Sequence, residues 1–163
     1  MSQALVVYTI GHSNHSMPAF LDLLRQHGVT LVLDVRSQPY SRWAPQFNRE
    51  TLDRDLEDAG LAYQFMGDAL GGRPADPALY VGGRPDYAQM EKDDAYQSSI
   101  ERLLALAETE SLALMCGEGD YQECHRHLLI SQTLLKRDVT VRHIKPDGRC
   151  VEAERIAEQL SLL

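Results

Sequence analysis

The sequence of 163 residues holds only three cysteines, three lysines and one tryptophan. A small, odd number of cysteines does not describe a disulfide scaffold, so we expect the cysteines to serve local chemistry or plain burial. No apolar run approaches the roughly 18 to 20 residues that a membrane-spanning helix needs. The stretch MSQALVVYTIGHS also lacks the basic region of a signal peptide. We therefore expect a cytoplasmic protein.

Basic residues are few relative to acidic ones, with 16 Lys and Arg against 24 Asp and Glu, which gives a formal charge of −8. Proteins that coat nucleic acid nonspecifically usually present a broad basic face, so this charge disfavours that class. Arginine dominates the basic residues, and Arg36, Arg42, Arg73 and Arg84 fall in expected loops. The planar guanidinium suits phosphate or carboxylate, which indicates a local anion site. A genomic bias toward arginine codons is the alternative interpretation.

Several sequence motifs with a known chemistry are also missing. The chain has no G-x-G-x-x-G dinucleotide fingerprint, no C-x2-C zinc knuckle and no C-x5-R loop of the cysteine phosphatases. It has no internal repeat and no low-complexity tract. With 44% hydrophobic and 25% charged residues, the composition is typical of a globular protein, and the length predicts a single domain over residues 1–163.

Short apolar runs rich in branched residues predict strands at 4–10, 30–35, 111–116 and 139–144, with a weaker candidate at 62–66. Helical spacing of apolar residues predicts helices over 17–28, 48–60, 124–137 and in two parts of 86–109, and a short C-terminal helix near 150–161. Ser16 is the candidate N-cap of the first helix, and Asn48 is the expected start of the second.

The alternation of strands and helices predicts an α/β fold, in which a mainly parallel open sheet of about five strands carries helices on both faces in a Rossmann-like, three-layer arrangement. The stretch 67–85 is rich in glycine and proline, which predicts an ordered loop or flap over one face. In open α/β sheets, ligands bind outside the carboxyl ends of the strands.

Polar residues directly follow three of the expected strands, in GHSNHS at 11–16, DVRSQPYSR at 34–42 and CGEGDYQECHR at 116–126. Because the carboxyl ends of parallel strands meet at one edge of the sheet, we expect these segments to form one site. The candidate anion-binding or substrate-binding residues are His12, Ser13, Asn14, Arg36, Ser41, Arg42, His125 and Arg126. The candidate catalytic residues are Asp34, Cys116, Glu118 and Cys124.

Each segment also has a purely structural interpretation. The GHSN turn can serve only to cap the helix that follows it. Asp34 can be structural, or it can pair with Arg36 and orient it. Tyr40 and Trp43 offer stacking surfaces beside Arg36 and Arg42, which suits a nucleobase and equally suits a packed loop.

The two cysteines of MCGEGDYQECHRH, at 115–127, differ in their expected surroundings. Cys116 ends an apolar strand, where a free cysteine is usually a small buried hydrophobe. Cys124 precedes a helix, and the helix dipole with adjacent His125 and Arg126 should lower its pKa. Four roles stay open: a nucleophile beside an anion clamp, a redox pair that brackets one loop, zinc ligands, or plain structure. Zinc is disfavoured because adjacent Cys124 and His125 cannot easily share one tetrahedral ion, and we assign no metal ligand.

The stretches YTIGHSNHSMPAFLDLL, LVLDVRSQPYSR, LGG at 70–72 and LMCGEGDYQECHRHLLI resemble the domain-of-unknown-function 488 family in order and spacing, from about residue 8 to 144. The resemblance implies an α/β fold and functionally important cysteine motifs, and it implies no reaction. Tyr121 and Gln122 stand where relatives often have a proline, and Cys150 belongs to none of the motifs. The family pattern carries over to Gly11, Ser13, Asp34, Arg36, Pro39, Ser41, Gly71, Gly72, Cys116, Glu118, Cys124, His125 and Arg126.

These observations lead to three functional hypotheses. The first is a binding site for an anionic small molecule, phosphorylated or nucleotide-like, with thiol-dependent transferase or hydrolase chemistry as an option. The second is a nucleic-acid-associated module that uses Arg36, Arg42 and the neighbouring aromatic residues. The third is a noncatalytic binding domain with structural cysteines. The sequence gives no indication of a membrane partner and leaves the cofactor, the substrate and the oligomeric state open.

Overall fold

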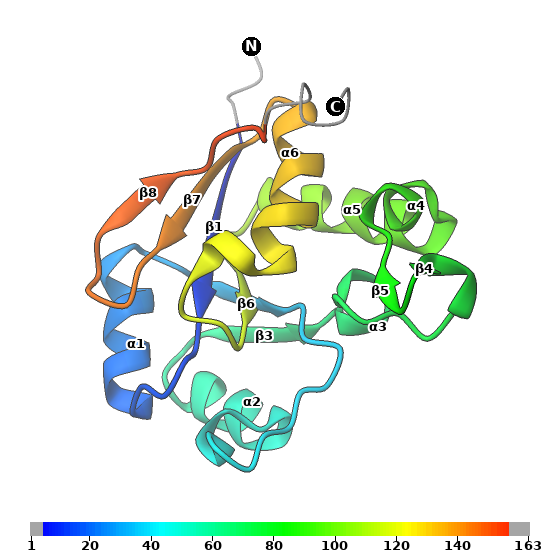
Figure 1. Cartoon of the computed structure of the whole chain (residues 1–163). Helices are drawn as coiled ribbons and strands as arrows, with labels where there is room; N and C mark the ends of the chain where they lie inside the picture. The colour runs from blue at the N-terminus through cyan, green and yellow to red at the C-terminus, as the bar shows by residue number, and fades with distance from the viewer. Residues whose placement is uncertain (1–4, 157–163) are drawn as a thin grey trace.

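The computed structural model describes residues 5–156 and shows strands that alternate with helices along the chain (Figure 1). The main sheet contains β1 (Val6–Gly11), β2 (Leu31–Asp34), β3 (Ala62–Phe65), β6 (Leu112–Cys116), β7 (Thr140–Ile144) and β8 (Cys150–Glu152), and a separate hairpin contains β4 (Tyr80–Val81) and β5 (Arg84–Pro85). The longer helices are α1 (Met17–Gln26), α2 (Arg49–Asp58), α4 (Tyr87–Lys92), α5 (Asp94–Ala107) and α6 (Gln132–Lys136). The remaining helical segments are α3 (Gly67–Leu70), the 3-10 turns η1 (Pro45–Phe47), η2 (Pro77–Leu79) and η3 (Tyr121–Glu123), and the π-helical turn η4 (Arg126–Ser131), which leads directly into α6.

The order of strands in the main sheet is β3-β2-β6-β1-β7-β8, and every neighbouring pair is parallel except β7 and β8. Strand β6 therefore lies between β1 and β2. Gly11 of β1 pairs with Cys116 of β6, and Asp34 of β2 pairs with Met115. This register ends the three strands at nearly the same level, so that the loops that follow them emerge side by side.

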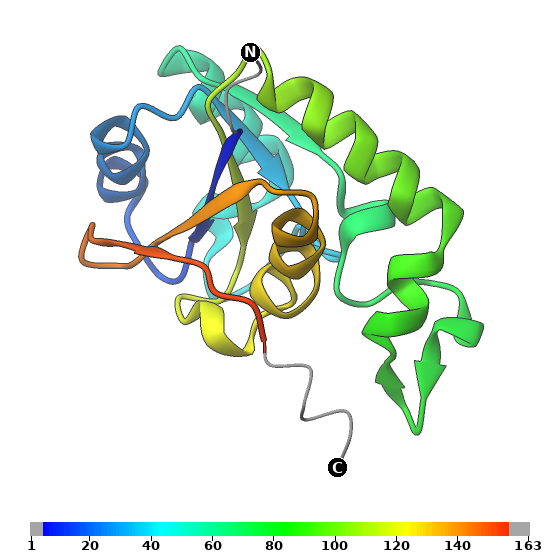
Figure 2. The same ribbon diagram turned by 90° about the horizontal axis from the view of Figure 1, so that it is seen from above.

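Helices cover both faces of the sheet, because its strands are apolar on both sides. Phe20 and Leu24 of α1 pack with Leu52 and Leu56 of α2 on one face. On the opposite face, α5 packs with η4 and α6 through residues such as Ile100. Figure 2 shows α1 (blue) and α5 (green) on opposite sides of the sheet. The predicted three-layer α/β fold is confirmed.

The predicted strands and the first helix agree with the structure in detail. All five expected strands are present, and Ser16 caps α1, because its hydroxyl oxygen accepts a hydrogen bond from the backbone N–H of Ala19 at 3.2 Å. The helix expected over 124–137 begins as the π-helical turn η4, where the hydroxyl of Ser131 donates to the carbonyl of Arg126. Asn48 precedes α2 as expected, but its side chain makes no capping bond.

Two predictions are corrected. The sheet has six strands rather than about five, and the C-terminal helix expected near 150–161 is wrong over residues 150–156, of which 150–152 form β8 and 153–156 are not helical. A turn with Gly148 at φ +91° folds the chain back so that β8 pairs antiparallel with β7. Residues 157–163 lie outside the described part of the chain. The stretch 67–85, expected to be a loop or flap, contains α3, η2 and the β4–β5 hairpin. Within residues 5–156, the helices fall short of the length and apolarity that a bilayer crossing requires.

Candidate functional site at the carboxyl ends of the strands

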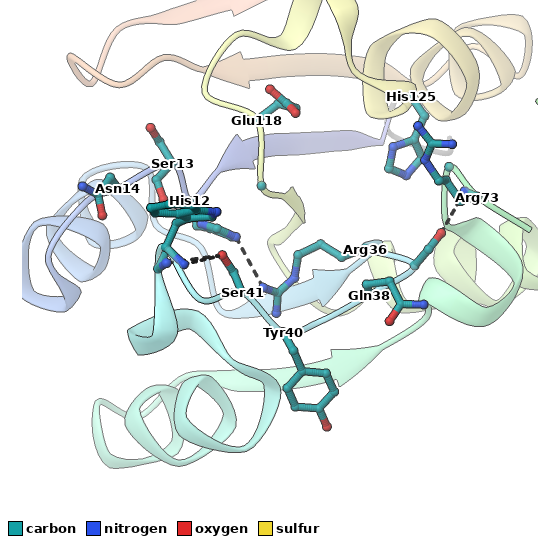
Figure 3. A pocket seen from close by; sticks show the side chains of 15 residues that line it. His12, Ser13, Asn14, Arg36, Gln38, Tyr40, Ser41, Arg73, Glu118 and His125 are labelled. Carbon is teal, nitrogen blue, oxygen red and sulfur yellow. Dashed lines mark hydrogen bonds between the residues drawn. The ribbon is translucent and has the colours of Figure 1, made fainter. Parts of the chain in front are cut away.

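A cavity of about 680 Å³ opens where β1, β2 and β6 end (Figure 3). The loops after these strands form most of its wall, and the segment after α3 and the residue that precedes η4 complete it. The three polar segments that the sequence predicted to converge do meet here. The residues that line the cavity are His12, Ser13, Asn14, Arg36, Ser37, Gln38, Tyr40, Ser41, Trp43, Ala44, Gly72, Arg73, Gly117, Glu118 and His125.

Backbone hydrogen bonds hold the loops after β1 and β6 together. The N–H of His12 donates to the carbonyl of Cys116 at 2.9 Å, and the N–H of Ser13 donates to the carbonyl of Gly117 at 3.1 Å. At Gly11 the two chains come so close that a Cβ atom would lie 1.6 Å from the carbonyl oxygen of Glu118. Only glycine fits at this position, and because it has no side chain, β1 and the loop after β6 can pack this closely in the wall of the cavity.

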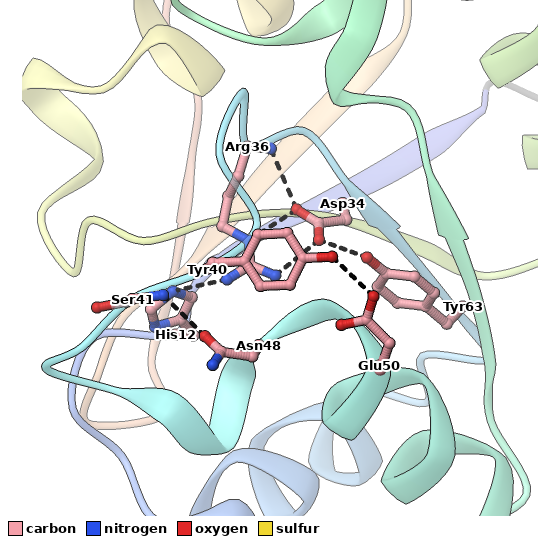
Figure 4. A network of polar contacts seen from close by, with 8 residues as sticks. All are labelled: His12, Asp34, Arg36, Tyr40, Ser41, Asn48, Glu50 and Tyr63. Carbon is pink, nitrogen blue, oxygen red and sulfur yellow. Dashed lines mark hydrogen bonds and ion pairs between the residues drawn. The ribbon is translucent and has the colours of Figure 1, made fainter.

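Asp34 and Arg36 form a buried ion pair at the end of β2 (Figure 4). The Nε and Nη2 atoms of Arg36 donate to the two carboxylate oxygens at 2.9 and 2.7 Å, and the backbone N–H of Arg36 donates to the same group at 3.1 Å. Tyr63 donates its hydroxyl to Asp34 at 2.6 Å, and burial together with this carboxylate raises the pKa of Tyr63 well above its ordinary value. The bidentate geometry fixes the plane of the guanidinium. Asp34 lies behind the cavity and positions Arg36, which lines it.

His12 lies between this ion pair and the cavity. Its Nε2 atom is 3.3 Å from Nη1 of Arg36, and its Nδ1 atom is 2.8 Å from the carbonyl oxygen of Ser13. Since the guanidinium can only donate and the carbonyl can only accept, the imidazole is neutral, with its proton on Nδ1. Burial lowers the pKa of His12, and Arg36 lowers it further. The ring stacks on Phe47 with 4.6 Å between the ring centres, so it has a fixed orientation.

The loop between β2 and η1 brings aromatic side chains to the edge of the cavity. Asn48 accepts a hydrogen bond from the backbone N–H of Ser41 at 2.7 Å, and the hydroxyl oxygen of Ser41 accepts from the N–H of Trp43 at 3.1 Å. This turn leaves Trp43 90% exposed. Tyr40 donates its hydroxyl to Glu50 at 2.7 Å. Asn48 therefore shapes the loop instead of capping α2.

Cys116 and Cys124 form a thiol pair behind the wall of the cavity. Their sulfur atoms are 2.8 Å apart, and the residues are only 3% and 4% exposed. Nδ1 of His125 lies 3.7 Å from Sγ of Cys124, while Nε2 donates to the carbonyl of Val35 at 3.0 Å. The hydrogen bond from Cys116 and the neighbouring His125 lower the pKa of Cys124 to about 4, whereas burial raises the pKa of Cys116. This arrangement favours ionisation of Cys124, whose sulfur can accept a hydrogen bond from the thiol of Cys116.

Arg126 is fully buried and does not reach the cavity. Its Nη1 atom donates to the hydroxyl of Thr9 at 2.7 Å, and its Nη2 atom donates to the carbonyl of Glu118 at 2.9 Å. Thr9 continues the chain of contacts to His143 at 2.6 Å, and His143 lies 3.1 Å from His127. Arg126 therefore ties the loop after β6 to β1, a role that its position beside Cys124 in the sequence did not indicate.

The candidate residues thus divide into three groups. The cavity brings together His12, Ser13, Asn14, Arg36, Ser41, Glu118 and His125. Asp34, Cys116, Cys124 and Arg126 are buried and outside its lining, and Arg42 is exposed and outside it as well. Ser37 and Gln38 of the segment 34–42, and Arg73 among the loop arginines, line the cavity although they were not among the candidate residues. The signal in the sequence that could have pointed to Arg73 is the LGG motif at 70–72, which directly precedes it. A Cβ atom at Gly72 would lie 2.9 Å from the His125 ring, so this glycine lets the segment approach the site.

A family model described as "Domain of unknown function DUF488" matches residues 16–133. The chain belongs to this family. The match contains Arg36, Arg73, both buried cysteines and His125, and it begins after the residues that follow β1. A search among curated proteins and a search among solved structures each found no match. Because the family description names no activity, the function of this DUF488 chain rests on the geometry of the site. Within the described residues, no group of three or more His, Cys, Asp or Glu side chains is placed to share a metal ion.

Proposed function

We propose that the protein binds a small phosphorylated or nucleotide-type ligand in the cavity at the carboxyl ends of β1, β2 and β6. The observation that carries the proposal is the convergence of two guanidinium groups, several hydroxyl groups and an exposed indole on one concave surface. Ligand sites of open α/β sheets have this location. The volume of about 680 Å³ also falls within the usual range for small-molecule sites.

Arg36 supplies oriented donors for an anion. Three of its side-chain N–H groups are used by Asp34 and His12. A guanidinium carries five N–H groups, so two are left for a ligand among the contacts of residues 5–156. Arg73 adds a second, exposed guanidinium on the cavity wall. A phosphate group can thus be held by the oriented donors of Arg36 on one side and by the exposed guanidinium of Arg73 on the other.

The cavity wall also contains an acid, which restricts the chemistry of the ligand. Glu118 lines the cavity together with the hydroxyl-bearing Ser13 and the amide of Asn14. A carboxylate repels phosphate and accepts hydrogen bonds from hydroxyl or amino groups. The lining therefore favours a ligand with an anionic end and a neutral polar end, as in a phosphorylated sugar or a nucleotide.

Trp43 favours the nucleotide within this class. Its side chain is 90% exposed although it is the largest apolar side chain in the chain, and Tyr40 beside the same cavity is 53% exposed. Stacking of a base on an aromatic side chain contributes about 1–3 kcal/mol. An exposed indole at the edge of an arginine-bearing cavity is suited to that contact.

Calorimetric titration with inorganic phosphate and with adenosine monophosphate tests the proposal. We expect the nucleotide to bind more tightly than phosphate, and R73Q to weaken both by about 10- to 150-fold, since a charge-assisted contact is worth about 1.5–3 kcal/mol. W43A should weaken the nucleotide alone. R42Q is the matched control, because Arg42 lies outside the cavity lining. Absence of binding by either probe at millimolar concentration, or an equal loss in R42Q and R73Q, contradicts the proposal.

A nucleic-acid-associated module is the second candidate, and the exposure of Arg42 next to Trp43 is the observation that favours it. In this case R42Q should weaken binding of a short single-stranded oligonucleotide as much as R73Q does. Affinity should also fall steeply as salt is added, because phosphate contacts release counterions. Absence of oligonucleotide binding at low salt removes this candidate.

A cytoplasmic location belongs to the same proposal, since a reducing compartment keeps buried thiols free. We do not extend the proposal to a thiol-dependent transferase or hydrolase. Neither sulfur atom belongs to a residue that lines the cavity, so a ligand held there would not contact a cysteine nucleophile.

A further inference from the structure

We propose that Cys116 and Cys124 form a redox centre in which a small hydroperoxide oxidises Cys124 and Cys116 then closes a reversible disulfide. This reaction takes place at the buried thiol pair and does not require a ligand in the cavity. Its oxidising substrate is a hydroperoxide.

The geometry of the pair is the first support. The two sulfur atoms are 2.8 Å apart, although the residues come from different elements, the end of β6 and the segment between η3 and η4. Closing a disulfide from this contact brings the sulfur atoms from 2.8 Å to about 2.05 Å, a movement of less than about 1 Å. A structural thiol needs no second thiol at this distance.

His125 is the second support, because it is placed to control the charge of Cys124. Its Nε2 atom donates to the carbonyl of Val35, so Nδ1 faces the sulfur of Cys124 at 3.7 Å without another described partner. Nδ1 can accept the thiol proton and later return a proton to a leaving group. The pKa of Cys124, lowered to about 4 by Cys116 and His125, agrees with a thiolate at neutral pH.

The two cysteines have different parts in the reaction. The thiolate of Cys124 attacks one oxygen of the hydroperoxide, an S–O bond forms, the O–O bond breaks, and the second oxygen leaves as an alcohol or water after it takes a proton. This step gives a sulfenic acid at Cys124. The sulfur of Cys116 then attacks the sulfur of Cys124, the S–O bond breaks, and hydroxide leaves as water with the Cys116 proton. Two thiols lose two electrons in total, and the O–O bond gains them.

The burial of the pair selects the oxidant by size. Cys116 and Cys124 are 3% and 4% exposed, so a bulky alkylating reagent has little access, whereas hydrogen peroxide is small. His125 separates Cys124 from the cavity and lines it, which makes the cavity the route of entry. Cys150 is exposed, and burial raises rather than lowers its pKa, so it provides an internal reference thiol.

The test is treatment of the full chain with hydrogen peroxide, followed by alkylation, tryptic digestion and mass spectrometry. Cys116 and Cys124 lie in one tryptic peptide, 103–126, because Arg102 and Arg126 bound it. We expect this peptide to lose two hydrogen atoms, to take up no alkylating label, and to regain both thiols with dithiothreitol. In the same sample, Cys150 should stay reduced, or react at least tenfold more slowly, because little of an ordinary thiol is ionised at neutral pH.

Variants separate the two steps. C116S should stop at the sulfenic acid, which a dimedone-type reagent labels at Cys124, and C124S should oxidise at least tenfold more slowly. C150S is the control and should match the wild-type rate. Oxidation of Cys150 while peptide 103–126 keeps both free thiols would overturn the inference, and so would the absence of dimedone labelling in C116S. A phosphate titration of the same protein shows separately whether the cavity binds its ligand.

Discussion

The position of Arg36 depends on the carboxylate of Asp34. Asp34 is fully buried and accepts hydrogen bonds from Arg36 and Tyr63, so its charge is compensated within the protein. Removal of one partner from a buried ion pair typically costs about 3–5 kcal/mol, because the other charge is left uncompensated. Arg36 would also lose the plane in which it faces the cavity.

We therefore expect D34N to lower the free energy of unfolding by about 3–5 kcal/mol. Y63F, which removes one hydrogen bond from the same carboxylate, should cost about 1.5–3 kcal/mol. Urea unfolding followed by circular dichroism measures both values. A D34N variant as stable as Y63F would show that the ion pair does not hold Arg36 in place.

His143 gives the stability of the protein a defined pH dependence. Burial and the neighbouring Arg126 lower its pKa to about 3. In the unfolded chain its pKa is near 6.5, so between about pH 6.5 and 3 the unfolded state binds a proton that the folded state does not. The free energy of unfolding is therefore not reduced by His143 above about pH 6.5, and it decreases as the pH falls from about 6.5 toward 3, because protonation of His143 favours the unfolded state.

Unfolding measured at pH 7 and pH 5 should show a loss of about 2 kcal/mol on acidification that is due to His143. H143Q should be less stable at pH 7, but its loss between the two pH values should be smaller by about that amount. His12, whose pKa burial also lowers, should retain part of the slope in the variant. An unchanged slope in H143Q would mean that His143 is not held neutral.

The places of the two central arginines differ in how far they could be predicted from the sequence. Arg36 follows a strand directly, so its place at the sheet edge was predictable from the parallel topology. Arg126 sits at the first turn of η4, and which side of a helix faces the protein interior depends on partners distant in sequence, here Thr9. The contact between Cys116 and Cys124 could not be predicted from the sequence either, because it depends on the path of the loop between them.

At the scale of elements, the close crossing of β1 and the loop after β6 sets the shape of the site. A Cβ atom at Gly11 would overlap the carbonyl of Glu118 at 1.6 Å, and backbone atoms cannot move aside as a flexible side chain can. A larger residue there must displace residues 117–119, which include two residues of the cavity wall.

G11A should therefore lose ligand binding and lower the free energy of unfolding by about 1–3 kcal/mol, the usual cost of overpacking. G28A is the matched control. Gly28 has φ +69° and no atom within 4 Å of its Cβ position, so alanine there adds backbone strain without contact. We expect G28A to be less stable and to bind normally. Normal binding by G11A, measured by calorimetry, would contradict this account of the wall.

The elements that the sequence missed also have physical explanations. β8 is a short edge strand with one partner, and its residues CVE carry little strand signal of their own. The turn before it was readable, because Pro-Asp-Gly at 146–148 is a typical turn sequence and Asp147 accepts a hydrogen bond from the N–H of Arg149 at 3.0 Å. The buried strands β2 and β6 were predictable because apolar residues fill both faces of each.

At the scale of the whole molecule, stability should decrease from the centre of the sheet to the β8 edge. β6 and β1 lie inside the sheet and make backbone hydrogen bonds on both sides, and all five residues of β6 are buried. β8 pairs only with β7. Local opening costs least where few buried contacts must break.

Hydrogen exchange followed by mass spectrometry should find the slowest exchange in β6 and β1 and much faster exchange in β8. The loops that line the cavity should exchange quickly in the free protein and slow down when a ligand is added. Equal protection of β8 and β6 against hydrogen exchange would mean that contacts other than its pairing with β7 stabilise β8.

A ligand site at the carboxyl edge of the sheet should be visible in the backbone amide resonances of the protein during a titration with adenosine monophosphate. We expect the shifts to cluster at residues 12–14, 36–38, 40, 41, 43, 72–73 and 117–118, which line the cavity. The opposite edge of the sheet offers a second groove, lined by residues such as Tyr8, Ser111 and Arg142. Shifts confined to that groove, or no shifts at millimolar nucleotide, would contradict a ligand site at the carboxyl edge.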